Sequence, residues 1–232
     1  MKILNLYAGI GGNRKLWGND HDITAVELDV NVAETYKDLW PNDKVIMADA
    51  HKFLLENYKD YGFIWSSPPC PSHSRARFGF GVCGHGYDYI YPDMSLYQEA
   101  ILLKHIYKGL WCIENVLPYY NYLIEPSIIL GRHAYWSNFY IEPKKFDTNN
   151  MIAGNTKAPG KLSQYGINGE KEFLKEMTGF DLEKYDGFDK RKALRNCVEP
   201  EAGLHILNCA MGVQTKTEQG ILFIEQALKG GE

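Results

Sequence analysis

The chain has 232 residues and a formal net charge of −4, and 45% of its residues are hydrophobic. This length suits one large domain with a substantial core, and the mild acidity gives no overall sign of nucleic-acid binding. No apolar run is long enough to span a bilayer, and the first residues lack a signal-peptide pattern, so we expect no membrane association. Five cysteines without a C-x-x-C pair indicate free thiols in a reducing, cytoplasmic setting.

Strand and helix patterns alternate along the first two thirds of the chain. The expected strands cover residues 2–7, 23–28, 44–47, 62–65, 110–113 and 135–141. One helix is expected to start near residue 13, and further helices are expected at residues 31–39, 49–58 and 95–107. Alternation at such short intervals predicts an α/β domain with a mostly parallel sheet.

The pattern changes between residues 143 and 189, where Gly, Asn and Lys become frequent and no strand–helix alternation remains. Helices are expected again after Pro200 and at 217–228. We therefore predict one domain formed by residues 1–142 plus 190–232, with 143–189 as a small inserted region. Residues 143–195 carry a net charge of +3 and the rest −7; this asymmetry permits a DNA-facing region, and a solvated mixed-charge surface explains it equally well.

A glycine-rich turn and two acids follow successive predicted strands. Gly9 and Gly11 come directly after the first strand, Glu27 ends the second, and Asp49 follows the third. Glycines let a backbone approach a ligand closely, and a carboxylate about 20 residues further on suits the hydroxyls of a ribose. Tyr7 is placed to cover an adenine face. Because a full G-x-G-x-x-G is absent, the spacing favours S-adenosylmethionine over a pyrophosphate-containing cofactor.

The stretch SSPPCPS places Cys70 behind two prolines at the end of the fourth strand, and Glu114 ends the fifth. Proline fixes φ and stiffens the approach to the thiol. A thiolate that adds to carbon 6 of a cytosine, with an acid near ring nitrogen 3, activates carbon 5 for methyl transfer. A thiol and a carboxylate at neighbouring strand ends suit this chemistry.

The sequence resembles the DNA (cytosine-5) methyltransferases. The matching stretches, in that family's order, are LYAGIGGNRKLWG, AVELDVNVAETY, MADAHKF, SSPPCPS, CIENV and RNCVEPEAGLHI. The resemblance implies a Rossmann-like S-adenosylmethionine-dependent methyltransferase fold with a small target-recognition region at 143–189. It also implies methylation of carbon 5 of a cytosine flipped out of double-stranded DNA.

The resemblance assigns roles to individual residues. Cys70 becomes the covalent nucleophile, Glu114 holds the cytosine ring edge, and Arg132 assists catalysis. The S-adenosylmethionine site would be lined by Tyr7, Ala8, Gly9, Gly11, Gly12, Glu27, Leu28, Asp49, Ala50, Pro68, Asn196 and Val198. Asn115 is expected to contact the DNA.

The sequence departs from the family pattern at several positions. Pro71 stands where glutamine is usual, Arg195 stands where glycine is common, and Arg132 lies in the stretch LGRHAYW in place of a Gln-x-Arg-x-Arg motif. Together with the short recognition region, the layout looks most like the small enzymes of phages and prophages, acting as monomers without an obligate protein partner.

The glycine-rich segment from Arg75 to Tyr91 is predicted to be a long loop beside the site. We expect Ser74, Arg75 and Arg77 to contact DNA phosphates as this loop closes.

Two alternatives remain open. The same chemistry on RNA is one, because the family has a tRNA-acting branch. The other is a non-catalytic nucleotide- or zinc-binding module. Cys70, His73, Cys83 and His85 form a C-x₂-H-x₉-C-x-H array, although a zinc ion there would consume the thiol and the spacing is not that of a standard finger, so we predict no metal.

Overall fold

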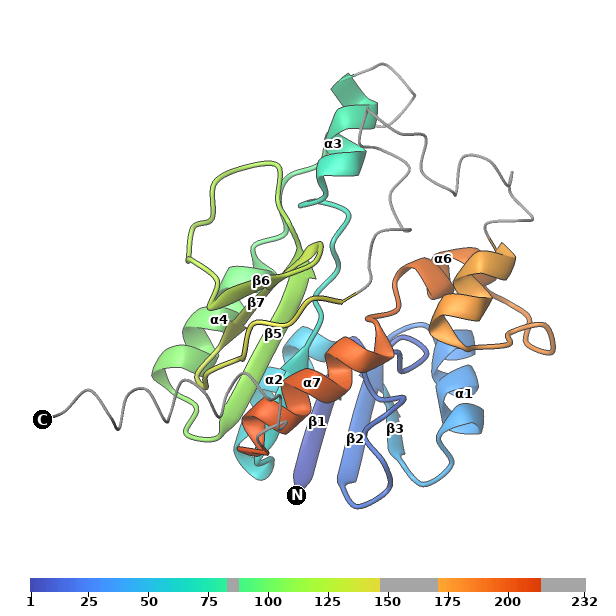
Figure 1. The fold of residues 1–232 in the computed structure, drawn as a ribbon, viewed down its shortest axis with the longest axis horizontal. Helices are drawn as coiled ribbons and strands as arrows, with labels where there is room; N and C mark the ends of the chain where they lie inside the picture. Colours follow the sequence, from blue (N-terminus) through green and yellow to red (C-terminus); the bar gives the residue numbers. More distant parts are fainter. Residues whose placement is uncertain (83–87, 147–170, 214–232) are drawn as a thin grey trace, which may run out of the picture.

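A seven-stranded sheet forms the centre of the computed structural model, which describes residues 1–82, 88–146 and 171–213 (Figure 1). The strand order is β3-β2-β1-β4-β5-β7-β6, and β7 runs antiparallel to β5 and β6 while the others run parallel. The strands are β1 Lys2–Leu6, β2 Asp22–Glu27, β3 Lys44–Met47, β4 Phe63–Ser66, β5 Leu110–Val116, β6 Ile128–Leu130 and β7 His133–Ser137.

Helices cover both faces of this sheet (Figure 1). They are α1 Val30–Leu39, α2 Ala50–Asn57, α3 Arg75–Val82, α4 Ser95–His105, α6 Lys190–Arg195 and α7 Pro200–Ala210, with a 3-10 turn at Tyr58–Asp60 and a helical segment at 171–178. Helices α2 and α4 pack on one face through Leu54 and Leu103, and α7 packs on the other through Ile206. Within the described residues, no helix combines the length and apolarity that a membrane crossing requires.

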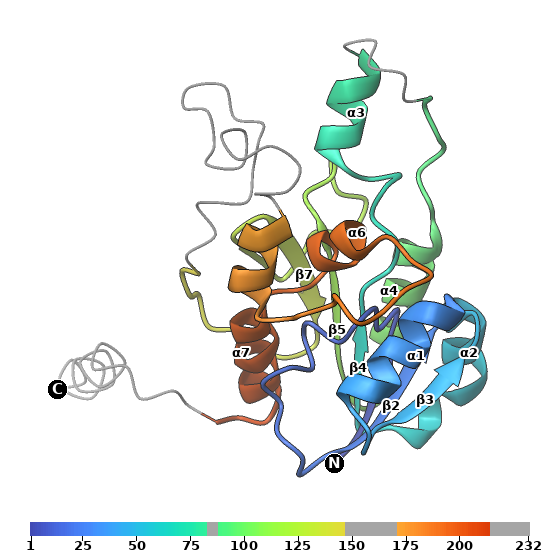
Figure 2. The ribbon, with the colours of Figure 1, turned by 90° about the vertical axis from the view of Figure 1, so that its right-hand side faces the viewer.

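The strand order places the predicted site residues at one edge of the sheet. The chain moves outward from β1 to β2 and β3, then returns to pair β4 with the other side of β1. This reversal of direction creates a crevice at the carboxyl ends of β1 and β4, which is where open α/β sheets bind their ligands. Figure 2 shows α3 and α6 at the same end of the molecule as these strand ends.

Trp65, Trp111 and Trp136 are buried in the core. Trp65 packs against Trp17 and Tyr135 in the layer between the sheet and α7. The core therefore forms where the apolar strand patterns indicated.

Two expected elements differ from the structure, and one observed strand was not expected. No helix starts near residue 13: residues 12–16 form turns, because the Arg14 side chain is buried in an ion pair with Asp43 (Nε to Oδ2, 2.8 Å) that overrides local helical preference. The segment predicted as a loop from Arg75 begins with α3. Strand β6 was not predicted, since three residues are too few to show a periodicity.

Part of the predicted inserted region is packed onto the sheet domain. Leu174, Phe180 and Leu182 are buried in a cluster with Ile10, and Lys184 forms an ion pair with Asp38 on α1 (2.7 Å). Residues 147–170 and the helix predicted at 217–228 lie outside the described residues. The division into 1–142 plus 190–232 and 143–189 stays a prediction.

Gly203 on α7 offers a test of how closely this helix approaches the turn after β1. An added Cβ would overlap the backbone of Asn13, so we expect Gly203→Ala to destabilise the fold by roughly 1–3 kcal/mol in urea unfolding. Gly79 on α3 is the control, because its Cβ position is open; there Ala should be neutral or stabilise by up to about 1 kcal/mol. Equal effects of the two changes would show that α7 does not pack as described.

Candidate functional site

The turn after β1 presents backbone groups to the crevice. Tyr7, Gly9 and Gly11 have φ angles of 55°, 54° and 82°, which for Gly9 and Gly11 explains the residue type. A Cβ on Gly9 would meet nothing within 4 Å, whereas one on Gly11 would overlap the Trp40 side chain. A side chain therefore packs against the turn at Gly11, whereas the space beside Gly9 is open. Ala8 is buried and its N–H donates to Val26 on β2 (3.0 Å).

Glu27 at the end of β2 faces this turn. Its Oε2 accepts a hydrogen bond from the Gly9 N–H (2.9 Å), and its Oε1 accepts from the N–H groups of Leu28 and Asp29. A carboxylate offers about four acceptor sites, so capacity remains on Oε2 for a hydroxyl of a ribose. Leu28 beside it is 69% exposed. An acceptor, an exposed apolar side chain and open space at Gly9 fit an adenosyl group.

The remaining predicted cofactor residues divide into exposed and packed ones. Asp49 is exposed and caps α2, where its Oδ1 accepts from the Lys52 N–H (3.1 Å), while Ala50 is buried. Gly12 and Val198 lie against each other, since a Cβ on Gly12 would overlap the Val198 backbone. Val198 is buried and the nearby Asn196 is exposed. The structure thereby brings the residues after α6 to the glycine turn.

A buried carboxylate that the sequence analysis missed connects the two halves of the crevice. Glu99 on α4 is fully buried and accepts hydrogen bonds from Tyr7 Oη (2.6 Å) and Ser66 Oγ (2.6 Å). His51 Nδ1 lies 3.0 Å from its Oε1. The hydrogen bond to Glu99 raises the pKa of His51, against its partial burial. The available signal was a carboxylate on the apolar face of the predicted helix 95–107.

Cys70 lies in the loop that follows β4, partly buried below the surface. The N–H groups of His73 and Ser74 both donate to the Cys70 carbonyl (3.0 and 3.1 Å), which forms a tight turn around the thiol. Asn115 is buried and its Nδ2 donates to the Pro68 carbonyl (2.9 Å). Asn115 therefore positions the Cys70 loop in this structure and does not face solvent.

The segments that follow β4 and β5 are also joined further out. Ser74 forms a β-bridge with Pro118, and Arg75 Nε donates to the Pro118 carbonyl (2.7 Å). The Tyr119 N–H donates to the His73 carbonyl (3.1 Å). These contacts hold the loop carrying Cys70 against the segment that follows Glu114.

Glu114 lies within β5 and is 7% exposed. Ser67 hydrogen-bonds its carboxyl group, and Arg132 acts on it electrostatically. His133 at the start of β7 reaches it from the neighbouring strand, with Nε2 3.7 Å from Oε1. Burial, with Arg132, lowers the pKa of His133 to about 3. At neutral pH His133 is therefore uncharged, and its contact with Glu114 is not an ion pair. Sequence analysis did not identify His133.

Electrostatic interactions link the candidate reactive groups. Burial, together with the Glu114 carboxyl, raises the pKa of the Cys70 thiol to about 11, while Arg132 and Lys192 oppose the rise. Burial raises the pKa of Glu114 to about 7, against Ser67 and Arg132. Burial likewise lowers the pKa of Arg132, and Glu114 and Cys70 oppose this. Cys70, Glu114 and Arg132 thus form one electrostatically coupled group.

Three of the residues predicted to bind DNA, namely Ser74, Arg75 and Arg77, lie on or just before α3. Ser74 Oγ accepts from the Arg77 N–H (3.4 Å), and Arg75 is exposed. The ring of Phe78 stacks on Tyr119 at 4.4 Å between centroids, and both are partly exposed. An aromatic and basic surface therefore borders the Cys70 loop.

No group of three or more His, Cys, Asp or Glu side chains is arranged to hold a metal ion in the part of the chain that the structure describes. Cys83 and His85 of the C-x₂-H-x₉-C-x-H array lie outside it.

Residues 1–82 match the family model of C-5 cytosine-specific DNA methylases. The match includes the glycine turn, Glu27, Asp49 and Cys70, so the resemblance seen in the sequence is confirmed for this part of the chain. It implies S-adenosylmethionine as the methyl donor, which agrees with the fit of an adenosyl group at Gly9 and Glu27. No curated protein sequence matches the chain.

Solved structures of methyltransferases resemble the fold. The Entamoeba histolytica methyltransferase EhMeth is 12% identical, with a TM-score of 0.52 over 91% of this chain and 98% of that one. A mutant of Spodoptera frugiperda DNMT2 is 24% identical, with a TM-score of 0.35 over 50% of this chain and 35% of that one. The chain thus spans about a third of the insect protein that it matches. The expected Rossmann-like methyltransferase fold is confirmed.

Glu114→Gln tests the environment of the candidate acid. The pKa of Glu114 is raised from 4.5 to about 7 in the folded state, so the native carboxyl binds a proton more tightly than the unfolded one. Its contribution to stability therefore decreases as pH rises from about 5 to 7 and is constant above. We expect Glu114→Gln to be more stabilising, or less destabilising, at pH 8 than at pH 5, by on the order of 1–3 kcal/mol.

Urea unfolding at the two pH values measures this difference. The same substitution at the exposed Glu34 on α1 controls for the loss of one negative charge. An effect of Glu114→Gln that does not change with pH would contradict the buried, proton-binding carboxyl.

Proposed function

We propose that the chain methylates carbon 5 of cytosine in double-stranded DNA, with Cys70 as the covalent nucleophile and Glu114 as the group that holds the ring. The observation that carries this proposal is the coupled group of Cys70, Glu114 and Arg132 beside a turn fitted to an adenosyl group. The family match over residues 1–82 supports the same chemistry. S-adenosylmethionine, when bound, supplies the methyl group.

Each of the three residues has a distinct part in the proposed reaction. The Cys70 thiolate adds to carbon 6, and the electron pair of the 5,6 double bond becomes available at carbon 5 for the methyl group. The Glu114 carboxyl donates a hydrogen bond to ring nitrogen 3, where negative charge develops. Arg132 stabilises the anionic groups around it. Water then removes the proton from carbon 5, and the Cys70–carbon 6 bond breaks to release the thiolate.

Burial of the site supports base flipping as part of this proposal. Glu114 is 7% exposed, and Cys70 lies in a turn below the surface. A cytosine paired inside a duplex cannot reach either group, so the base must leave the stack. Ser74, Arg75 and Arg77 are proposed to hold the DNA backbone on α3. A phage or prophage origin stays a prediction from the resemblance.

A covalent trap tests the function directly. We expect DNA duplexes carrying 5-fluorocytosine, mixed with the protein and S-adenosylmethionine, to give a denaturant-stable adduct by intact mass, because fluorine blocks the final elimination. Cys70→Ser should abolish the adduct, and Cys209→Ser, which changes a cysteine on α7, should retain it. An adduct that forms on RNA carrying 5-fluorocytosine, and not on the DNA duplexes, would identify RNA as the substrate. A folded chain that binds S-adenosylmethionine and forms no adduct on either would contradict the mechanism.

The pH dependence of the rate tests the roles of the two groups. The proposed reactive form carries a Cys70 thiolate and a protonated Glu114, although their pKa values are about 11 and about 7. This form is a minor state whose fraction rises with pH up to the lower pKa and is then constant up to the higher one. We therefore expect kcat/KM for methyl transfer to rise up to about pH 7 and then level off.

In the Glu114→Gln variant, kcat/KM should no longer level off near pH 7. With one titrating group left, kcat/KM of the variant should be lower by about 10²-fold or more and should keep rising above pH 7. A variant profile that levels off at the wild-type pH would assign the titration to another group.

A further inference from the structure

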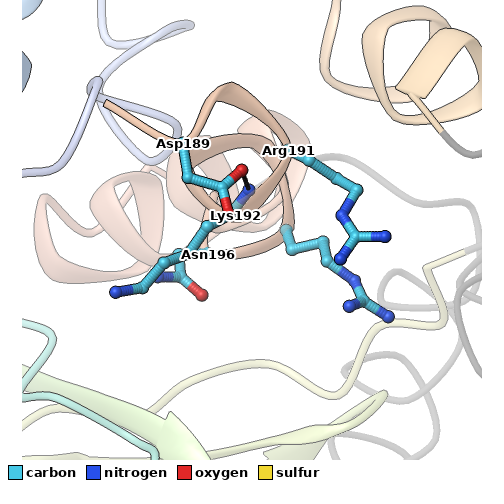
Figure 3. Close-up of a pocket in the computed structure, with 5 residues that line it drawn as sticks. Asp189, Arg191, Lys192 and Asn196 are labelled. Atoms are coloured by element: carbon cyan, nitrogen blue, oxygen red, sulfur yellow. Dashed lines mark hydrogen bonds between the residues drawn. The ribbon is translucent and has the colours of Figure 1, made fainter. Parts of the chain in front are cut away.

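A strongly basic pocket lies on α6, outside the residues assigned to catalysis. It has a volume of about 220 Å³ and is lined by Asp189, Arg191, Lys192, Arg195 and Asn196. Figure 3 shows Arg191 extending to one side of α6, with Lys192 and Asn196 on the other. Sequence analysis assigned only Asn196, to the cofactor.

The residues that line this pocket carry a net positive charge. The Asp189 carboxylate caps α6, where its Oδ1 accepts from the Lys192 N–H (3.0 Å). Three cationic side chains accompany this one carboxylate. Arg191 and Arg195 are four residues apart, so they lie on the same face of the helix and repel each other weakly. A phosphate within reach of both guanidinium groups would accept charge-assisted hydrogen bonds from each of them.

The size of the pocket favours a phosphate over a whole cofactor. Sites for drug-sized molecules and cofactors are usually 300–1,000 Å³, and this pocket is smaller. Its lining side chains are polar or charged, which does not suit an adenine ring. A single phosphodiester group with part of its hydration fits both the volume and the charge.

The pocket lies within electrostatic range of the candidate reactive groups. Lys192 opposes the rise in the pKa of Cys70, which burial and Glu114 cause, and Arg195 acts on Arg132. Helix α6 also stands at the same end of the molecule as α3 and the carboxyl ends of the parallel strands (Figures 1 and 2). A phosphate in the pocket would therefore belong to a nucleotide close to the one that enters the site.

We propose that the α6 pocket binds a backbone phosphate of the nucleic-acid substrate next to the target nucleotide, through Arg191 and Arg195. This inference rests on the proposed function for the identity of the polymer. It adds a second basic contact surface, across the site from Arg75 and Arg77 on α3. Two such contacts on either side of an extruded base would hold the backbone in register.

The test is the salt dependence of DNA binding by an Arg191→Ala/Arg195→Ala variant. Binding of a fluorescein-labelled cytosine-containing duplex is followed by anisotropy between 50 and 200 mM NaCl. Loss of one phosphate contact should reduce the slope of log K against log [salt] by about 0.9 and weaken binding about tenfold at low salt. The Kd for S-adenosylmethionine should not change, and a thermal melt establishes that the variant folds.

Two further variants sharpen the result. Lys37→Ala/Lys104→Ala removes two exposed cations from α1 and α4, so it matches the change in net charge and should leave the slope nearly unchanged. Arg191→Lys/Arg195→Lys keeps the charge and should recover most of the slope. A slope for the Arg191→Ala/Arg195→Ala variant equal to that of the control would overturn the proposal. Loss of S-adenosylmethionine affinity with an unchanged slope would overturn it too, by assigning the pocket to the cofactor's carboxylate.

The DNA-binding test of the pocket and the covalent-trapping test of the proposed function can fail independently of each other. A wild-type chain that forms the fluorocytosine adduct while the variant binds DNA normally would refute only the pocket. A chain that forms no adduct but loses salt-dependent binding on substitution of the two arginines would keep the pocket and refute the methylation. A wild-type chain that binds neither DNA nor RNA would refute both.

Discussion

The buried carboxylate of Glu99 constrains the whole crevice. A charge in the interior is stable only when it is paired and hydrogen-bonded, and Glu99 meets this requirement with Tyr7, Ser66 and His51. These partners belong to the glycine turn, the strand before the Cys70 loop and α2. Satisfying one carboxylate therefore fixes the distance between the cofactor turn and the nucleophile loop. Tyr7 has a structural role here, because its hydroxyl supplies one of the donors.

Parallel strands make this arrangement compact, because each strand ends at the same edge of the sheet. Cys70 and Glu114 come from β4 and β5, which pair directly. The hydrogen bond from the Asn115 side chain to the Pro68 carbonyl and the backbone bond from Tyr119 to His73 continue that pairing beyond the strands. The loop that carries the thiol is therefore held by hydrogen bonds that continue those of the sheet, although the loop itself is irregular. Precision at a reactive thiol needs such support, since loops alone hold side chains loosely.

The sequence predicted every described strand except β6, the helices α1, α2, α4 and α7, and the site edge, because these depend on local periodicity and on glycine and proline. It failed where tertiary contacts decide. Residues 12–16 do not form a helix because Arg14 is drawn into a buried pair with Asp43. Glu99 and His133 were missed because each gains its role from partners far along the chain. Asn115 was expected at the DNA, yet its burial against Pro68 follows from the pairing of β4 and β5, which no local pattern reveals.

The electrostatics of the site favour a thiol that is unreactive until substrate is present. Burial outweighs Arg132 and Lys192, so Cys70 is protonated in the free protein and resists adventitious oxidation. Entry of a base displaces water and brings a polar ring edge to Glu114. Because the pKa of Glu114 is about 7, its carboxyl group gains or loses a proton near neutral pH at a small cost in free energy. The cationic side chains of Lys192 on α6 and of Arg132, which precedes β7, then act on the place where the thiolate forms. Burial therefore has two effects. It suppresses the thiolate in the free protein. It also strengthens the interaction of the thiolate with the nearby cations once the site is filled, because charges interact more strongly when water is excluded.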